Sequence, residues 1–280
     1  MNAKNHKDTT ENNANSGIKS DSISSDTRIV IVGASHAGIS FAENMRNNGF
    51  TGSLTLVDRQ KGGPMERPPL SKAFLLEETD QVNPMFLLKR GKWYKEKEIS
   101  LKHGVTVTEI NTTLQTVTLS DGEQLEFDKL VLATGAVPRT LPSTEGLANV
   151  FVLRQPDDAT AIRATARVAN SAVIIGGGYI GLEVAASLRK LGLEVSVVEM
   201  ANRLLARVAS PPVAELLNDL HVEHGVSVYT GVGVNKILNS DGKFTGVTLA
   251  DGSSLNGDML IVGIGVIPDS KLAQQAGVET

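Results

Sequence analysis

Short apolar runs separated by turns rich in Gly, Asn and Asp make up most of the chain after residue 27. The run RIVIV (28–32) precedes a glycine-containing turn, a stretch with apolar residues at helical spacing, and a second apolar run, LTLV (54–57). The order strand, turn, helix, strand is typical of a βαβ unit with a parallel sheet. The same order recurs at AVII (172–175), a glycine turn, a helical stretch and VSVV (195–198). The pattern therefore predicts two α/β units of the same kind.

A second pair of matched blocks follows these units. Residues 117–138 (VTLSDGEQLEFDKLVLATGAVP) and 247–268 (VTLADGSSLNGDMLIVGIGVIP) align without a gap. In each block, alternating apolar and polar residues around an Asp-Gly pair predict antiparallel strands joined by a tight turn. Each block then ends in a buried strand and a glycine turn. The sequence thus describes one structural unit that occurs twice.

The remaining segments predict helices and a passage between two lobes. We expect a short helix at Ser71, a helical region over 84–102, and helices over 157–168 and 210–224. Proline and threonine become frequent over 138–156, which marks the crossing into a second lobe. We therefore divide the chain into a flexible tail at 1–27, a first lobe at 28–139, a second lobe at 140–258, and a C-terminally truncated return to the first lobe at 259–280.

Composition and charge exclude several classes of function. The net charge is −4, so a general basic field for nucleic acid is absent. No apolar stretch reaches the 18 to 20 residues of a membrane span, and residues 1–27 lack the apolar core of a secretory signal, so we expect a cytoplasmic protein. The 280 residues include no cysteine, which excludes an electron relay through a protein dithiol in this chain.

Gly176, Gly178 and Gly181 fit the pattern G-x-G-x-x-G directly after an apolar strand. In a dinucleotide-binding loop the first glycine permits a tight turn, the second lets backbone approach a diphosphate, and the third lets the helix pack close to the strand. The diphosphate then faces the N-terminus of the helix, where free N–H groups and the helix dipole favour an anion. We therefore expect a bound dinucleotide in the second lobe, against the alternative of a purely structural glycine turn.

Glu199 ends the next strand, 23 residues after Gly176. An acid at about this spacing binds the ribose 2′-hydroxyl and repels a 2′-phosphate. NADH is therefore the expected nucleotide. Arg203 lies four residues further on and leaves NADPH possible, unless it is an ordinary surface arginine.

The first glycine motif departs from the ideal pattern, because Ser35 stands between Gly33 and Gly38 where the second glycine is usual. A serine is small enough to clear a diphosphate, and its hydroxyl can donate to one. Asp58, 25 residues after Gly33, is the acid expected to bind ribose here. The alternative for Asp58 is a solvated strand end. Two adjacent dinucleotide sites indicate passage of hydride or electrons between two cofactors.

The chain resembles the flavin-dependent pyridine nucleotide oxidoreductases, and most closely their ferredoxin and rubredoxin reductase branch. The resemblance rests on ERPPLSK (66–72), LVLATGAVPR (130–139), GGGYIGLEVAASL (176–188) and MLIVGIGVIP (259–268), and it covers the chain from Arg28 to Thr280. It implies two Rossmann-like lobes, with FAD in the first and NAD(P)H in the second. Hydride would pass from NADH to FAD, and single electrons would leave to a small iron–sulfur carrier of the ferredoxin or rubredoxin type.

The resemblance also assigns residues to these sites. Lys72 would approach the flavin ring near N5 and place positive charge where negative charge develops, and Glu183 would lie near the nicotinamide. Val107 would meet the adenine half, and Arg154 would contact the flavin. The full set of residues expected to bind the cofactors is Gly33, Ser35, Ala37, Gly38, Asp58, Arg67, Lys72, Val107, Thr134, Gly135, Arg154, Gly176, Gly178, Tyr179, Ile180, Gly181, Glu199 and Gly263.

Other polar clusters carry less chemistry. His221 and His224 are three residues apart on an expected helix, but no third metal ligand accompanies them, so we expect an exposed polar face and no metal site. The run KRGKWYKEKE (89–98) fits a solvated helix face, with docking of an acidic electron carrier as the alternative.

Two other functions remain open. By the resemblance, the family's chain continues to a Gly-Asp motif that binds the flavin and to a third domain, and neither occurs in these 280 residues. The chain could then be a non-catalytic nucleotide-binding protein or a fragment, with a filled NAD lobe and an empty flavin lobe. A redox sensor similar to apoptosis-inducing factor is a third reading, since RPPLSK occurs there too.

Overall fold

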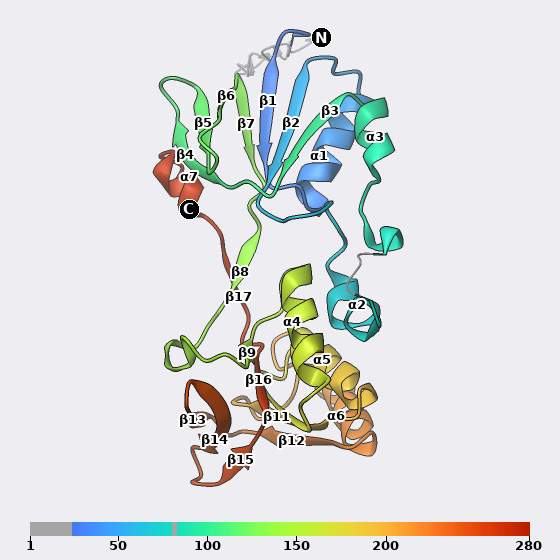
Figure 1. The fold of residues 1–280 in the computed structure, drawn as a ribbon, viewed down its shortest axis with the longest axis vertical. Coiled ribbons are helices and arrows are strands. Elements are labelled where there is room, and N and C mark those ends of the chain that lie inside the picture. Colours follow the sequence, from blue (N-terminus) through green and yellow to red (C-terminus); the bar gives the residue numbers. More distant parts are fainter. Residues whose placement is uncertain (1–23, 80–82) are drawn as a thin grey trace, which may run out of the picture.

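The protein consists of two α/β lobes joined by a narrow neck, as the computed structural model in Figure 1 shows. Residues 24–79 and 83–280 are described, so most of the tail expected at 1–27 lies outside them. Each lobe contains a parallel sheet, a glycine loop that leads into a helix, and a three-stranded antiparallel sheet. In these ranges no helix is long and apolar enough to cross a membrane.

The first lobe is built on a four-stranded parallel sheet. Its strand order is β3-β2-β1-β7, with β1 (Arg28–Val32) in the interior beside β2 (Ser53–Asp58). Helix α1 (His36–Asn47) connects these two strands, and Gly49 follows its end with φ of 84°. The other strands are β3 (Ile99–His103) and β7 (Lys129–Leu132), both parallel to their neighbours. The expected βαβ unit is confirmed.

The second lobe repeats this arrangement. Its five parallel strands have the order β12-β11-β10-β16-β9, and α5 (Tyr179–Lys190) joins β10 (Ser171–Ile175) to β11 (Glu194–Glu199). The register of the paired strands is the same in both lobes, since Val32 lies beside Val57 and Ile175 beside Val198. The other elements are α4 (Pro156–Ala166), α6 (Pro211–Glu223), β9 (Val150–Phe151), β12 (Val226–Thr230) and β16 (Met259–Val262).

The matched blocks form matched antiparallel sheets and the neck. The first sheet contains β4 (Val107–Asn111), β5 (Thr116–Leu119) and β6 (Gln124–Glu126), and the second contains β13 (Val234–Ser240), β14 (Lys243–Leu249) and β15 (Ser254–Asn256). The two glycine turns then lead into β8 (Ala136–Pro138) and β17 (Val266–Pro268), which pair with each other. The duplicated ends of the two blocks therefore hold the lobes together (Figure 1).

Short elements complete the chain, and one expected helical region is wrong. These elements are η1 (Pro68–Ser71), α2 (Ala73–Leu76), η2 (Pro84–Phe86), α3 (Gly91–Glu96), η3 (Pro142–Thr144) and α7 (Lys271–Gln275). The helical region expected over 84–102 is wrong, because only η2 and α3 are helical there and Ile99–His103 forms the edge strand β3. Polar residues alternate with apolar ones in an edge strand with one exposed face, and the lysine-rich sequence masked that period.

The run 89–98 is mostly exposed, as expected of a solvated face, but one of its residues is buried. Tyr94 in α3 is 6% exposed and packs with Ile39 and Ile99 in the core of the first lobe.

The boundary between the lobes near the C-terminal end differs from the expected one. Residues 259–262, expected in the first lobe, form β16 beside β10 in the second sheet. The chain crosses back only at β17, because β16 must first complete the hydrogen bonds of the second sheet.

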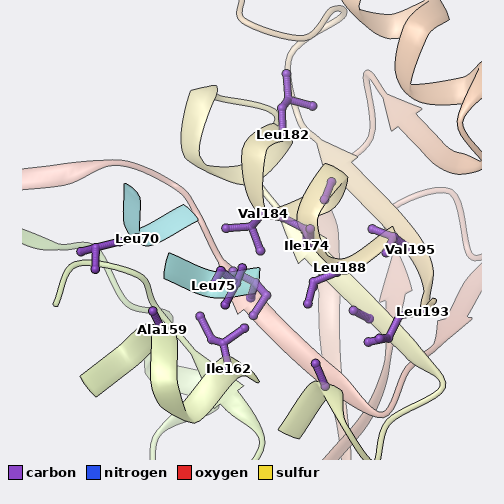
Figure 2. Close-up of a cluster of buried hydrophobic side chains, with 14 of the residues drawn as sticks. Leu70, Leu75, Ala159, Ile162, Ile174, Leu182, Val184, Leu188, Leu193 and Val195 are labelled. Atoms are coloured by element: carbon purple, nitrogen blue, oxygen red, sulfur yellow. The ribbon is translucent and has the colours of Figure 1, made fainter. Parts of the chain in front are cut away.

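The segment from Met65 to Leu75 belongs to the first half of the sequence but packs in the core of the second lobe. Phe74 and Leu75 are at most 1% exposed there, in one cluster with Ile162 of α4 and Leu188 of α5. Figure 2 shows Leu70 and Leu75 from this segment among the side chains of α4, α5 and the second sheet. The two lobes therefore share a hydrophobic core on one side of the neck, which fixes where this segment presents its polar residues.

A duplicated aspartate fixes the start of the central strand in each lobe. Asp128 accepts hydrogen bonds from Arg28 N (2.7 Å) and the Arg28 guanidinium (Nη2, 2.9 Å). Asp258 accepts from Asn170 N (2.8 Å) and Ser171 N (3.0 Å). These bonds favour the carboxylate, so the Arg28 side chain lowers the pKa of Asp128 to about 2, and the Asn170 amide lowers the pKa of Asp258.

We expect Asp128→Asn to lower the unfolding midpoint at pH 6 and to reduce the loss of stability in acid. A carboxyl with a depressed pKa in the fold stabilises it above the unfolded pKa of about 3.9, and this contribution disappears as the pH falls towards about 2. Urea unfolding at pH 6, 4 and 2.5 measures the effect. Equal dependence on pH in the variant and the parent would show that the pair with Arg28 does not contribute. Asp121→Asn, in an exposed turn, is the control.

Candidate functional site

The first glycine of each motif lies against the turn that follows the neighbouring strand. Gly33 and Gly176 have φ of 107° and 113°, which glycine adopts at little cost and other residues avoid. A Cβ on Gly33 would lie 2.2 Å from Ala133 O, and one on Gly176 would lie 2.4 Å from Gly263 O. The backbone of Gly263 therefore packs directly against the second glycine loop. Its role in cofactor binding stays a prediction, and its position would let it act by supporting Gly176.

The third glycine of each motif brings its helix onto the loop. A Cβ on Gly38 would lie 1.9 Å from Gly33 O, and one on Gly181 would lie 2.0 Å from Gly176 O. Both distances are far below any real contact, so helices α1 and α5 could not begin where they do with a larger residue there. The two loops are thus closed in the same way.

The second position of each motif is free of such contacts. A Cβ on Gly178 would meet no protein atom within 4 Å, although Gly178 is the N-cap residue of α5. The fold therefore does not require glycine here, whereas close approach of a ligand to the backbone does. Ser35 takes the corresponding position before α1, where its side chain does not cap the helix and lines a cavity.

The two predicted ribose-binding acids hold their glycine loops in the same way. Asp58 accepts hydrogen bonds from Ala34 N (2.7 Å) and Gln60 N (2.8 Å). Glu199 accepts from Gly177 N (2.7 Å) and Ala201 N (2.8 Å). A carboxylate has about four acceptor positions, so each acid can also accept from a ribose hydroxyl. Positioning the loop is a second role, one that spacing alone does not reveal.

An open cavity lies over the first glycine loop, between the two halves of the chain that line it. It brings together eight of the predicted binding residues, namely Gly33, Ser35, Asp58, Arg67, Val107, Thr134, Gly135 and Arg154. Ala37 and Gly38 lie in the first turn of α1, Ala37 exposed and Gly38 buried in the closure of the loop. The cavity faces the N-terminus of that helix, which favours an anionic ligand.

Three arginines line this cavity: Arg59, Arg67 and Arg154. Arg67 donates to Arg154 O across the two halves of the chain, and burial together with the Arg154 charge lowers its pKa. Its Nε atom is buried with no hydrogen-bond partner within the described ranges. A buried donor without a partner is costly, so an anionic ligand fits this wall of the cavity.

Asp269 is a cavity residue that sequence reasoning missed. Its backbone oxygen accepts from Thr134 Oγ1 (2.6 Å), its N–H donates to Gly135 O (2.9 Å), and its carboxylate pairs with Arg59 (3.1 Å). It directly follows Pro268 at the end of the second matched block, where the first block has Arg139. A comparison of the two blocks shows this difference, but only the pairing of β8 with β17 brings Asp269 to the first glycine loop.

Lys72 and Glu183, the two predicted catalytic residues, form an ion pair with Nζ and Oε2 2.6 Å apart. Ser71 also donates to the Glu183 carboxylate through its hydroxyl. Lys72 lies between η1 and α2 in the first half of the chain, and Glu183 lies in the second turn of α5, two residues after Gly181. The Lys72 side chain is 51% exposed and that of Glu183 is 29% exposed. Both side chains are therefore partly accessible from solvent.

Tyr179 and Ile180 open helix α5 and are 55% and 44% exposed. They flank the open position at Gly178, so the N-terminus of α5 presents a partly apolar surface.

The described residues include no group of three His, Cys, Asp or Glu side chains that could hold a metal ion. The ring nitrogens of His221 lie 2.8 Å from Leu217 O and 3.1 Å from Leu182 O.

Relatives of known name match the chain over most of its length. It is 41% identical over 257 residues to putidaredoxin reductase of Pseudomonas putida, covering 90% of this chain and 60% of the relative. It is 39% identical over 251 residues to rhodocoxin reductase of Rhodococcus erythropolis, covering 89% and 58%. The chain thus spans about three-fifths of the length of these relatives.

Solved structures agree with the fold. The ferredoxin reductase for the CYP199A2 system from Rhodopseudomonas palustris matches with a TM-score of 0.86 and 36% identity, over 91% of this chain and 63% of that one. Putidaredoxin reductase in its covalent complex with putidaredoxin matches with a TM-score of 0.85 and 40% identity, over 92% and 63%. Residues 27–280 also match the family model described as pyridine nucleotide-disulphide oxidoreductase. The resemblance drawn from the four sequence motifs is confirmed, and the chain belongs to the pyridine nucleotide-disulphide oxidoreductase family.

Proposed function

We propose that this chain forms the FAD-binding and NAD(P)H-binding part of an oxidoreductase that serves a small iron–sulfur carrier of the ferredoxin or rubredoxin type. The observation that carries the proposal is the pair of glycine loops closed in the same way, one under an arginine-lined cavity and one open at Gly178. The names of the relatives, which are reductases of putidaredoxin and rhodocoxin, support the class of partner. Residues 28–139 with 266–280 would bind FAD, and 140–262 would bind the nucleotide. A cytoplasmic location remains part of the proposal.

FAD would occupy the cavity of the first lobe. The N-terminus of α1, with Gly33 and Ser35, would face its diphosphate, and Arg67 would supply positive charge and the unpartnered Nε donor. Asp58 would accept from the ribose, and Val107, Thr134, Gly135 and Arg154 would line the rest of the site. A bound flavin would accept hydride from a reduced nicotinamide and release electrons one at a time.

NADH would bind the second glycine loop. Gly178 leaves its backbone open to a diphosphate, and Glu199 would accept from the 2′-hydroxyl while repelling a 2′-phosphate. Tyr179 and Ile180 would contact the nucleotide at the start of α5. Preference for NADH over NADPH follows from the charge of Glu199.

Lys72 and Glu183 would act where the two cofactors meet. Their ion pair joins the segment at residues 65–75 to the second turn of α5, so it would hold the ammonium of Lys72 at one place. A fixed cation contributes most where negative charge develops during a reaction. In hydride transfer the protein contributes mainly by holding the reactants close and oriented, and this pair supplies both charge and orientation.

The absorption spectrum of the purified chain tests the proposal. We expect a yellow protein, or one that takes up added FAD, with absorbance near 450 nm that NADH bleaches without oxygen. Reduction of an added ferredoxin-type carrier should then depend on NADH. NADH binding with no flavin uptake would instead select the non-catalytic nucleotide-binding protein, in which the first lobe stays empty. Absence of binding of either cofactor would refute both functions.

A further inference from the structure

Arg203 is half-buried, and its guanidinium is hydrogen-bonded to the backbone that follows it. Its Nη1 donates to Ala209 O (2.9 Å) and its Nη2 to Ala206 O (3.0 Å), so the guanidinium lies inside the turn formed by residues 204–209. Nη1 also lies 3.5 Å from Leu204 O. Since the planar guanidinium presents its donors in a fixed fork, these bonds set the shape of the turn.

The turn around Arg203 is strained and contacts the second glycine loop. Leu205 has φ of 52° although it is a bulky residue, and it is 3% exposed. Such a conformation persists only where surrounding contacts enforce it. The N–H of Leu205 donates to Gly177 O (2.9 Å), and a Cβ on Gly177 would lie 2.6 Å from Leu204 Cδ2.

Gly177 is therefore held from both sides. Glu199 accepts from its N–H, and the turn around Arg203 donates to its carbonyl oxygen. The first contact fixes the peptide between Gly176 and Gly177, and the second fixes the peptide between Gly177 and Gly178, the open position of the loop. The charge of Arg203 is already bonded to carbonyl oxygens, which leaves it poorly placed to bind a phosphate.

We propose that Arg203 is a positioning residue for the second glycine loop and does not bind a 2′-phosphate. The inference rests on the proposed nucleotide site in the second lobe. Loss of the guanidinium releases the turn, and the loop then becomes less ordered for any nucleotide. Discrimination between NADH and NADPH stays with Glu199.

We expect Arg203→Ala to raise the dissociation constants of NADH and NADPH by the same factor, about ten-fold each, which corresponds to about 1.4 kcal/mol. Arg203→Lys should give an intermediate value, because an ammonium cannot reach both Ala206 O and Ala209 O with one fixed fork. Arg207→Ala, which removes an exposed arginine from the same turn, is the matched control and should bind NADH normally. Fluorescence titration with each nucleotide measures these constants. Weaker binding of NADPH alone, or no change, would overturn the proposal.

Hydrogen exchange tests the same contact without any nucleotide. The Leu205 amide should exchange faster in Arg203→Ala, while amides in the first glycine loop should exchange as before. Unchanged exchange at Leu205 would overturn the positioning role. If the parent protein binds neither nucleotide but exchange at Leu205 still rises in the variant, the proposed function fails and the role of Arg203 in the loop stands.

Discussion

Gly181→Ala is expected to destabilise the protein by about 3 kcal/mol and to abolish NADH binding, whereas Gly178→Ala should keep the fold and lose only affinity. A Cβ at position 181 would lie 2.0 Å from Gly176 O, and both atoms belong to backbone that packed helices and strands hold in place. Overpacking of this kind costs about 1 to 3 kcal/mol or more. Relief would require moving α5 away from the loop.

At position 178 the same methyl group meets no protein atom within 4 Å, and φ of −84° suits alanine. The free energy of unfolding should therefore change by at most about 0.5 kcal/mol. The methyl group would instead occupy the space where a diphosphate approaches the backbone, so we expect at least about ten-fold weaker NADH binding. Urea unfolding and NADH titration of both variants separate the two effects. Gly178→Ala with parental affinity would show that no ligand approaches this position.

Lys72→Met is expected to slow NADH-driven flavin reduction by about 100-fold while leaving stability nearly unchanged. Removing one preorganised charge from a site where charge develops costs about 100-fold to 1000-fold in rate. The stability effect is small because the pair with Glu183 is partly exposed, and such pairs contribute about 0 to 1 kcal/mol. Stopped-flow absorbance at saturating NADH measures the rate.

Two variants make the Lys72 result specific. Lys89→Met removes an ion pair of the same length, 2.6 Å to Glu43, on the first lobe away from the cavity residues, and should keep the parental rate. Lys72→Arg keeps the charge and should recover part of the rate. Equal rates for Lys72→Met and Lys89→Met would remove Lys72 from the reaction. A large loss of stability in Lys72→Met would indicate a structural role instead.

The two halves of the chain differ in what lies between their second and third strands. In the second half, the turn around Arg203 and helix α6 fill this interval. In the first half, the interval carries η1, α2 and α3, and its residues 65–75 cross to the core of the second lobe. The duplicated scaffold thus supplies two nucleotide loops, while this unequal segment supplies Lys72. In the proposed reaction, the difference between the two nucleotide sites would therefore come from this segment.

The residues of the glycine loops could be predicted because their constraints are local. Gly33 and Gly176 need positive φ, and Gly38 and Gly181 need the absence of a Cβ, over intervals of only a few residues. Edge strand β3 could not be predicted in the same way. Its pairing with β2 depends on a partner more than 40 residues away, and the lysine-rich sequence before it obscured the alternation.

The sequence by itself determined the duplication, the βαβ units, the glycine loops and the acids that follow them, because each depends on residue type and short spacing. Only the tertiary structure decided that Lys72 meets Glu183, that Arg67 donates to Arg154 O, and that Asp269 accepts from Thr134. These contacts link residues 87 to 135 positions apart, and packing of β8 on β17 and of residues 65–75 on the second lobe creates them. Local sequence propensity cannot predict contacts between residues so far apart, because these contacts result from burying apolar surface that the two lobes share.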